Sequence, residues 1–139
     1  MRKLLILALS VLVLGGCTSG SFFTPISSIN SKAVPSQVTE NSDGSTTFEF
    51  KFTLEPFDAR KALQRIDEFL AGYANEKKFT GYEVEKVNGK TIAGSNDGGS
   101  SWVAPASASF AMSQSDKTTI NGKDQYGRIL VMARFRTQQ

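Results

Sequence analysis

The stretch that decides the fold is Thr47-Phe48-Glu49-Phe50-Lys51-Phe52-Thr53-Leu54-Glu55. Apolar and polar side chains alternate along it, which is the period of a β-strand with one buried face and one face in water. Pro56 follows directly and ends the strand, because proline cannot donate a ladder hydrogen bond. We therefore expect Phe48, Phe50 and Phe52 to lie together on the buried face of a sheet.

A hairpin is predicted upstream of this strand, at the turn signal Asp43-Gly44. A two-residue turn would place Val38 opposite a glutamate. A three-residue loop over 42–44, with a left-handed glycine, instead places Val38 opposite Phe48 and Val34 opposite Phe52. The second register pairs apolar with apolar residues, so we expect it.

A helix is predicted after Pro56. Apolar residues recur there at the three-and-four spacing of a single buried stripe, and charged residues occupy the rest. Asp58 is the expected N-cap, and Lys77 and Lys78 suit the negative end of the helix. The stripe consists of Ala59, Ala62, Leu63, Ile66, Phe69, Leu70 and Tyr73.

Further strands are expected toward the C-terminus. Residues 82–87 and 90–95 flank Asn88-Gly89, a strong hairpin signal. Residues 106–113 and 128–136 also alternate. Folding these two segments about Asn121-Gly122 pairs Phe110 with Ala133 and Met112 with Val131.

The predicted fold is a single α+β domain over residues 34–139. One amphipathic helix packs on a meandering antiparallel sheet of five to seven strands. We expect its core to include Phe48, Phe50, Phe52, Leu63, Ile66, Phe69, Phe110, Val131 and Phe135.

The N-terminus has the order of a secretory signal. Arg2 and Lys3 precede an apolar run over 4–14, and small residues follow. As a helix the run would be about 16 Å long, which is too short for roughly 30 Å of bilayer hydrocarbon. Residues 1–16 are therefore expected to be a signal peptide.

The end of the signal, Leu14-Gly15-Gly16-Cys17, resembles the lipobox of bacterial lipoproteins. The resemblance implies cleavage after Gly16 and lipid on Cys17. Thr18 stands where an aspartate would imply retention at the inner membrane. The expected location is therefore the outer membrane, on its periplasmic face, with the protein held by its lipid.

Residues 17–33 are expected to be the lipidated cysteine and a flexible tether, because serine, threonine, glycine and asparagine predominate. Phe22, Phe23, Ile26 and Ile29 are too apolar for a pure spacer. Some of them are expected to dock on the domain or to lie at the lipid surface, and a partner-binding segment is the alternative.

A second motif runs from Ser95 to Trp102, and it resembles the Asp-box of sialidases and other secreted proteins. The resemblance implies a hairpin turn that joins strands over 90–95 and 101–105. Ser95, Asp97 and Gly99 would form the turn, with Trp102 folded beneath it. A plain loop, or a Trp102 that contacts a ligand, are the alternatives. One copy of the motif does not predict sialidase activity, which needs a propeller of many repeats.

The chain contains no histidine, and Cys17 is its one cysteine. This composition excludes Ser-His and Cys-His dyads, a zinc site of usual composition and an internal disulfide. The carboxylate pairs Glu83/Glu85 and Asp67/Glu68 are interpreted as solvated surface, because a glycosidase needs acids that converge from different elements. We expect no enzymatic activity, no cofactor and no metal.

Removal of Arg2 and Lys3 with the signal leaves 14 basic residues against 13 acidic ones, a net charge of +1. This balance does not predict nucleic-acid binding. Arg128, Arg134 and Arg136 share one strand face, which could bind an acidic partner or a lipid headgroup.

Three function classes follow. The first is a non-enzymatic envelope lipoprotein that binds protein as an accessory component of an envelope assembly. The second is a lipoprotein that binds glycan, peptidoglycan or lipid through Trp102 or the three arginines. The third, a carboxylate-based hydrolase, is the least favoured.

Overall fold

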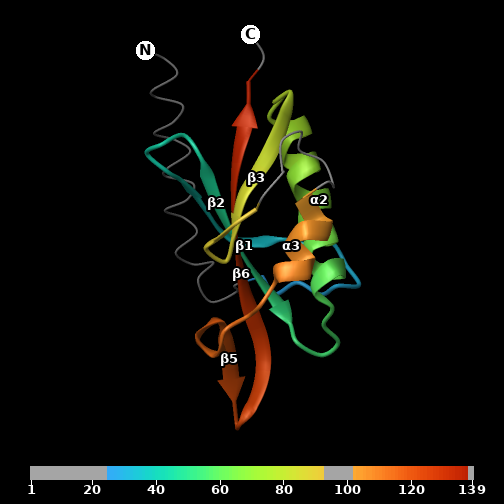
Figure 1. Ribbon diagram of the computed structural model, residues 1–139. Coiled ribbons are helices and arrows are strands. Elements are labelled where there is room, and N and C mark those ends of the chain that lie inside the picture. Colours follow the sequence, from blue (N-terminus) through green and yellow to red (C-terminus); the bar gives the residue numbers. More distant parts are fainter. Residues whose placement is uncertain (1–24, 93–101, 138–139) are drawn as a thin grey trace.

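The protein is described by a computed structural model that covers residues 25–92 and 102–137. Within these residues, six strands form one antiparallel sheet, and two helices lie on the same side of it (Figure 1). The strands are β1 (Pro35–Glu40), β2 (Thr46–Thr53), β3 (Gly81–Val87), β4 (Lys90–Thr91), β5 (Lys117–Ile120) and β6 (Lys123–Arg136), and the helices are α2 (Ala59–Glu76) and α3 (Val103–Ser109). The α+β class and the antiparallel sheet agree with the prediction. No helix in the described part of the chain is long and apolar enough to cross a membrane.

The sheet is not a meander. Its strand order is β1-β2-β6-β3-β4. The remaining strand, β5, pairs with the N-terminal part of β6. Because β2 and β3 are both antiparallel to β6, they run parallel to each other and need a crossover connection. Helix α2 makes that crossover, and the 14-residue β6 fills the position between the two strands.

The predicted β1–β2 register is confirmed at the turn, where Val38 lies opposite Phe48 and Gly44 has φ 94°. The pairing of Val34 with Phe52 is wrong. A bulge between Pro35 and Gln37 shifts the register, so that Pro35 lies opposite Phe50. Ser27 instead forms a parallel bridge to Phe52.

Helix α2 begins as predicted, since Oδ1 of Asp58 accepts a hydrogen bond from the Lys61 amide at 3.0 Å. The ring of Phe69 lies 5.6 Å from those of both Phe48 and Phe50, which joins the helix to β2. The buried residues of α2 are Ala62, Leu63, Ile66, Leu70 and Ala74.

Most of the predicted core is fully buried. Phe69, Phe110 and Phe135 are only partly buried, and they pack against the edge of the buried cluster. The fully buried members of the predicted set are Phe48, Phe50, Phe52, Leu63, Ile66 and Val131.

The strands predicted over 101–105 and 106–113 are wrong, because the chain forms helix α3 there. Val103 and Ala106 are its buried residues, at helical rather than strand spacing, and the N-cap Trp102 is buried as well. Alternating alanine and serine imitated a strand period, although alanine favours helix and Pro105 is tolerated in a first turn. Phe110 and Met112 therefore pair with neither Ala133 nor Val131.

Both predicted Asn-Gly turns are present. Asn88 and Gly89 have positive φ and join β3 to β4, and Asn121-Gly122 joins β5 to β6 with Ile120 opposite Lys123. The return strand expected over 90–95 is described only as Lys90–Thr91, and residues 93–95 lie outside the described part.

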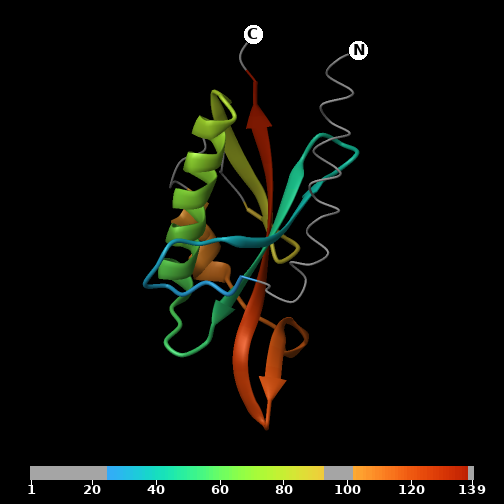
Figure 2. The ribbon, with the colours of Figure 1, turned by 180° about the vertical axis from the view of Figure 1, so that it is seen from behind.

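Residues 25–33, expected as part of the tether, lie on the domain. Ile29 and Ala33 are 5% and 3% exposed, and Nε of Arg65 donates to the Ile29 carbonyl at 2.9 Å. Figure 2 shows this segment passing the lower half of α2 before the chain returns as β1. The packed domain therefore begins before residue 34.

Candidate functional site

Trp102 lies in the core. Its side chain is 0% exposed, and its Nε1 donates a hydrogen bond to Oδ1 of Asp67 on α2 at 2.8 Å. The hydroxyl of Tyr82 on β3 donates to the same oxygen at 2.5 Å. One carboxylate thus joins α2, β3 and the start of α3. Asp67 was predicted to be plain surface, and Ser95, Asp97 and Gly99 lie outside the described residues.

Arg128 and Arg134 lie on the sheet face away from the helices, and both are paired with carboxylates of the domain. Arg128 lies 3.2 Å from Asp116 and 3.9 Å from Glu49. Arg134 lies 2.9 Å from Glu85 and 3.6 Å from Asp43. An acidic ligand would have to compete with these internal partners. Arg136 is exposed near the end of the same strand, beside Gly81.

The electrostatics of this face reflect the pairing. A hydrogen bond from Ser45, helped by the charge of Arg134, lowers the pKa of Asp43. Burial raises the pKa of Asp116, but hydrogen bonds from Ser113 and Arg128 outweigh it, so that this pKa is also lowered. The hydrogen bond to Glu85 raises the pKa of Arg134. All of these charges are satisfied within the domain.

The carboxylates interpreted from the sequence as surface pairs do not face each other across a cleft in the described residues. Glu85 is held by Arg134, and Glu68 pairs with Arg65 at 3.2 Å along α2. In residues 25–92 and 102–137 no group of three potential ligands is placed to hold a metal ion.

The strand β1 lies at one edge of the sheet. β1 pairs with β2 on one side, and no described strand lies on its other side. Val38 is 41% exposed there, although it lies opposite the buried Phe48. Of the strands at the margins of the sheet, β1 is the longest in the described chain.

A notch of about 330 Å³ lies between α2 and residues Lys32 and Ala33, which come just before β1. Phe69 and Tyr73 form its apolar part, and the ring of Tyr73 packs on Phe48 with centroids 5.1 Å apart. Burial raises the pKa of the Tyr73 hydroxyl, and the charge of Glu40 adds to the effect. The notch is lined by Lys32, Ala33, Arg65, Glu68, Phe69, Gly72, Tyr73 and Glu76.

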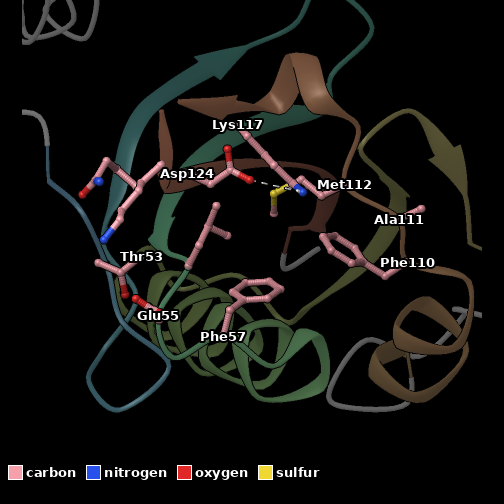
Figure 3. Close-up of a pocket in the computed structure, with 11 residues that line it drawn as sticks. Thr53, Glu55, Phe57, Phe110, Ala111, Met112, Lys117 and Asp124 are labelled. Atoms are coloured by element: carbon pink, nitrogen blue, oxygen red, sulfur yellow. Dashed lines mark ion pairs between the residues drawn. The ribbon is translucent and has the colours of Figure 1, made fainter. Parts of the chain in front are cut away.

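An open groove of about 910 Å³ lies at the end of β2 (Figure 3). The rings of Phe57 and Phe110 lie 6.2 Å apart beside Met112, and Leu54 completes the apolar floor. Lys117 and Asp124 form an ion pair of 3.8 Å above them. Met112 packs directly on the β6 backbone, since a Cβ at Gly127 would overlap its sulfur. Sequence reasoning missed this groove because it placed Phe110 and Met112 on a strand.

The chain was compared with models of known protein families, with curated proteins and with solved structures, and none of them matches it.

Proposed function

We propose that this chain is a lipid-anchored lipoprotein of the bacterial outer membrane that lacks enzymatic activity and binds another envelope protein. The order of residues 1–17 supports export and lipid attachment at Cys17. The absence of histidine from the sequence and the paired carboxylates of the described domain disfavour a hydrolase. The protein would act as an accessory component of an envelope assembly.

The β1 edge with its neighbouring notch is the observation that carries the binding proposal. An edge strand exposes backbone N–H and C=O groups, to which an extended peptide of a partner can add as a further strand. A notch of about 330 Å³ beside that edge accepts an apolar side chain of the same peptide. Such a volume is at the small end for sites that enclose a metabolite. The partner is therefore an extended peptide with an apolar anchor.

Gly72 supports this assignment. It lies inside the 18-residue helix α2 and lines the notch, and a Cβ built on it meets nothing within 4 Å. Glycine in a helix interior costs about 1 kcal/mol relative to alanine. Packing in the folded domain therefore does not require a glycine at this position, and a large side chain there would reduce the open volume of the notch.

The test is co-purification of a partner with the full-length protein from membranes. Gly72→Leu fills the notch with a good helix former and should abolish the association. Ala71→Leu makes a similar change at the adjacent exposed position of α2, outside the notch, and should leave it intact. Equal recovery of the partner with both variants would refute the notch as the binding site.

Lipid attachment is tested separately. Cys17→Ala should abolish incorporation of radiolabelled palmitate and leave the precursor with its signal peptide. Palmitate that remains on the variant protein would rule out Cys17 as the lipidated residue.

A further inference from the structure

Two hairpin turns of this fold carry nearly the same sequence. Val87-Asn88-Gly89-Lys90 joins β3 to β4, and Ile120-Asn121-Gly122-Lys123 joins β5 to β6. Their backbones also agree, since φ is 49° and 82° at the asparagine and glycine of the first turn and 54° and 80° in the second. Positive φ at both positions is typical of a two-residue type I′ turn. Neither the local sequence nor the backbone therefore distinguishes the two asparagines.

The side chain of Asn88 is held by the sheet. Its Oδ1 accepts a hydrogen bond from the Leu130 amide at 2.7 Å, and its backbone amide donates to the Leu130 carbonyl at 2.8 Å. Its Nδ2 is buried. The carboxamide of Asn88 therefore cannot rotate without breaking a hydrogen bond to β6.

The side chain of Asn121 is exposed at the tip of the β5–β6 hairpin, which projects from the rest of the domain (Figure 1). The preceding residue, Ile120, is 51% exposed. Within the described residues, the carboxamide of Asn121 makes no hydrogen bond. It is therefore free to turn toward the backbone nitrogen of Gly122.

From this contrast we propose that Asn121 is a site of spontaneous deamidation in the folded protein and that Asn88 is protected from it. The backbone nitrogen of Gly122 attacks Cγ of Asn121, so that a new C–N bond forms and the Cγ–Nδ2 bond breaks. Nδ2 leaves as ammonia, and the proton lost by the Gly122 nitrogen goes with it. Glycine leaves the attacking nitrogen unhindered, because it has no Cβ.

Water completes the reaction and is its only co-reactant. Addition of water at Cγ of the cyclic imide reopens the new bond and gives aspartate. Addition at the main-chain carbonyl carbon breaks the original peptide bond and gives isoaspartate, whose backbone runs through Cβ and Cγ. Both routes replace the neutral amide of Asn121 with a carboxylate.

The products change the groove end of the domain. The new carboxylate lies in the turn between β5 and β6, and Lys117 and Lys123 of these strands line the groove. Isoaspartate also adds a backbone carbon to a two-residue turn, which then no longer matches the register of the paired strands. Deamidation therefore alters both the charge and the shape of this hairpin.

Mass spectrometry of the full-length protein tests the proposal. The folded protein is incubated in mildly alkaline buffer, and a lysine-specific protease at mildly acidic pH then releases residues 87–90 and 118–123 as separate peptides. The acid form should accumulate at least about ten-fold faster at Asn121 than at Asn88, which corresponds to a barrier difference of about 1.4 kcal/mol. Equal rates, or a faster reaction at Asn88, would overturn the proposal.

The same measurement in urea is the control for local sequence. The two asparagines differ only in a preceding valine or isoleucine over these four residues, so their rates in the unfolded chain should be similar. A ratio in urea as large as that in the folded protein would overturn the proposal, because the sequence alone would then set the rates.

Asn121→Gln provides a matched variant. Glutamine keeps the carboxamide but places it one carbon farther from the backbone, so the peptide 118–123 should stay unmodified. Acid formation in this peptide at the wild-type rate would also overturn the proposal. These results do not depend on partner binding at the β1 notch, because the hairpin of Asn121 contributes no residue to it.

Discussion

The two faces of the sheet are built from the same strands but are held by different forces. Under the helices, Phe48 is fully buried and packs against the rings of Phe50, Phe69, Tyr73 and Phe135. On the opposite face, arginines pair with carboxylates at 2.9–3.9 Å, and these side chains stay partly exposed. Apolar burial contributes about 25 cal/mol per Å², whereas exposed ion pairs contribute little, about 0–1 kcal/mol each. The comparison indicates that the inner face provides the stability, and the outer face mainly provides charge complementarity between strands.

The largest effect is expected on the inner face. Phe50→Ala should lower the free energy of unfolding by about 3–5 kcal/mol, because it removes a fully buried ring and leaves a cavity. Urea denaturation measures the change. Lys51→Ala, on the outer face next to it, should change stability by less than about 0.5 kcal/mol. Similar losses at both positions would contradict the contrast between the faces.

The next largest effect should come from the polar contact beneath α2. Trp102→Phe keeps an aromatic ring in the core but removes the hydrogen bond to Asp67, and should cost about 1–3 kcal/mol. In Asp67→Ala protein the same Trp102 change should cost less, since the acceptor is already gone. Denaturation of the four proteins of this double-mutant cycle gives the coupling. A coupling energy of zero would show that the hydrogen bond does not stabilise the fold.

A smaller effect is expected for the outer ion pairs. Arg128→Ala removes contacts to Asp116 and Glu49, and should lower the free energy of unfolding by no more than about 1 kcal/mol. Added salt should reduce the difference in the free energy of unfolding between the wild type and the variant, because screening weakens interactions between exposed charges. A loss as large as that of Phe50→Ala would mean that the outer face carries much of the stability.

The smallest effect is the pH dependence contributed by Asp43. Its pKa is lowered in the folded state from the ordinary value of 3.8, so the ionised form stabilises the fold. That contribution is complete above the unfolded-state pKa and is lost as the pH falls through the lower folded-state pKa. Urea midpoints measured between pH 5 and pH 2 should therefore fall less steeply for Asp43→Asn than for the wild type. Parallel curves would show that Asp43 makes no such contribution.

Local sequence signals predicted much of the fold. Strict alternation identified β2, the three-and-four spacing identified α2, and turn residues located three hairpins. The same logic was wrong over 101–113, because small alternating residues satisfy the strand and helix periods about equally well. Trp102 is buried, which is consistent with the core role expected for it. Its hydrogen-bond acceptor, Asp67, could not be identified from the spacing of residues in the sequence.

Among the candidate sites, the three arginines were placed correctly on one face, because side chains two apart on a strand share a face. Their engagement by Asp43, Glu49, Glu85 and Asp116 could not be predicted, since these acids come from separate elements. The notch and the groove were missed for the same reason, because each is formed where segments distant in sequence meet.

The sequence by itself determined which segments are β2, α2 and the Asn-Gly turns, because those depend on periodicity and backbone preferences within about ten residues. It also determined the expectation of export and of lipid at Cys17, which depends on a contiguous N-terminal motif. Only the tertiary structure decided that β6 lies between β2 and β3 and that residues 25–33 dock on the domain. It also decided that a notch forms beside α2 and a groove forms at the end of β2. These features depend on which buried faces meet between segments that are distant in the sequence. The hydrophobic periodicity of one segment carries no information about the segment against which it packs.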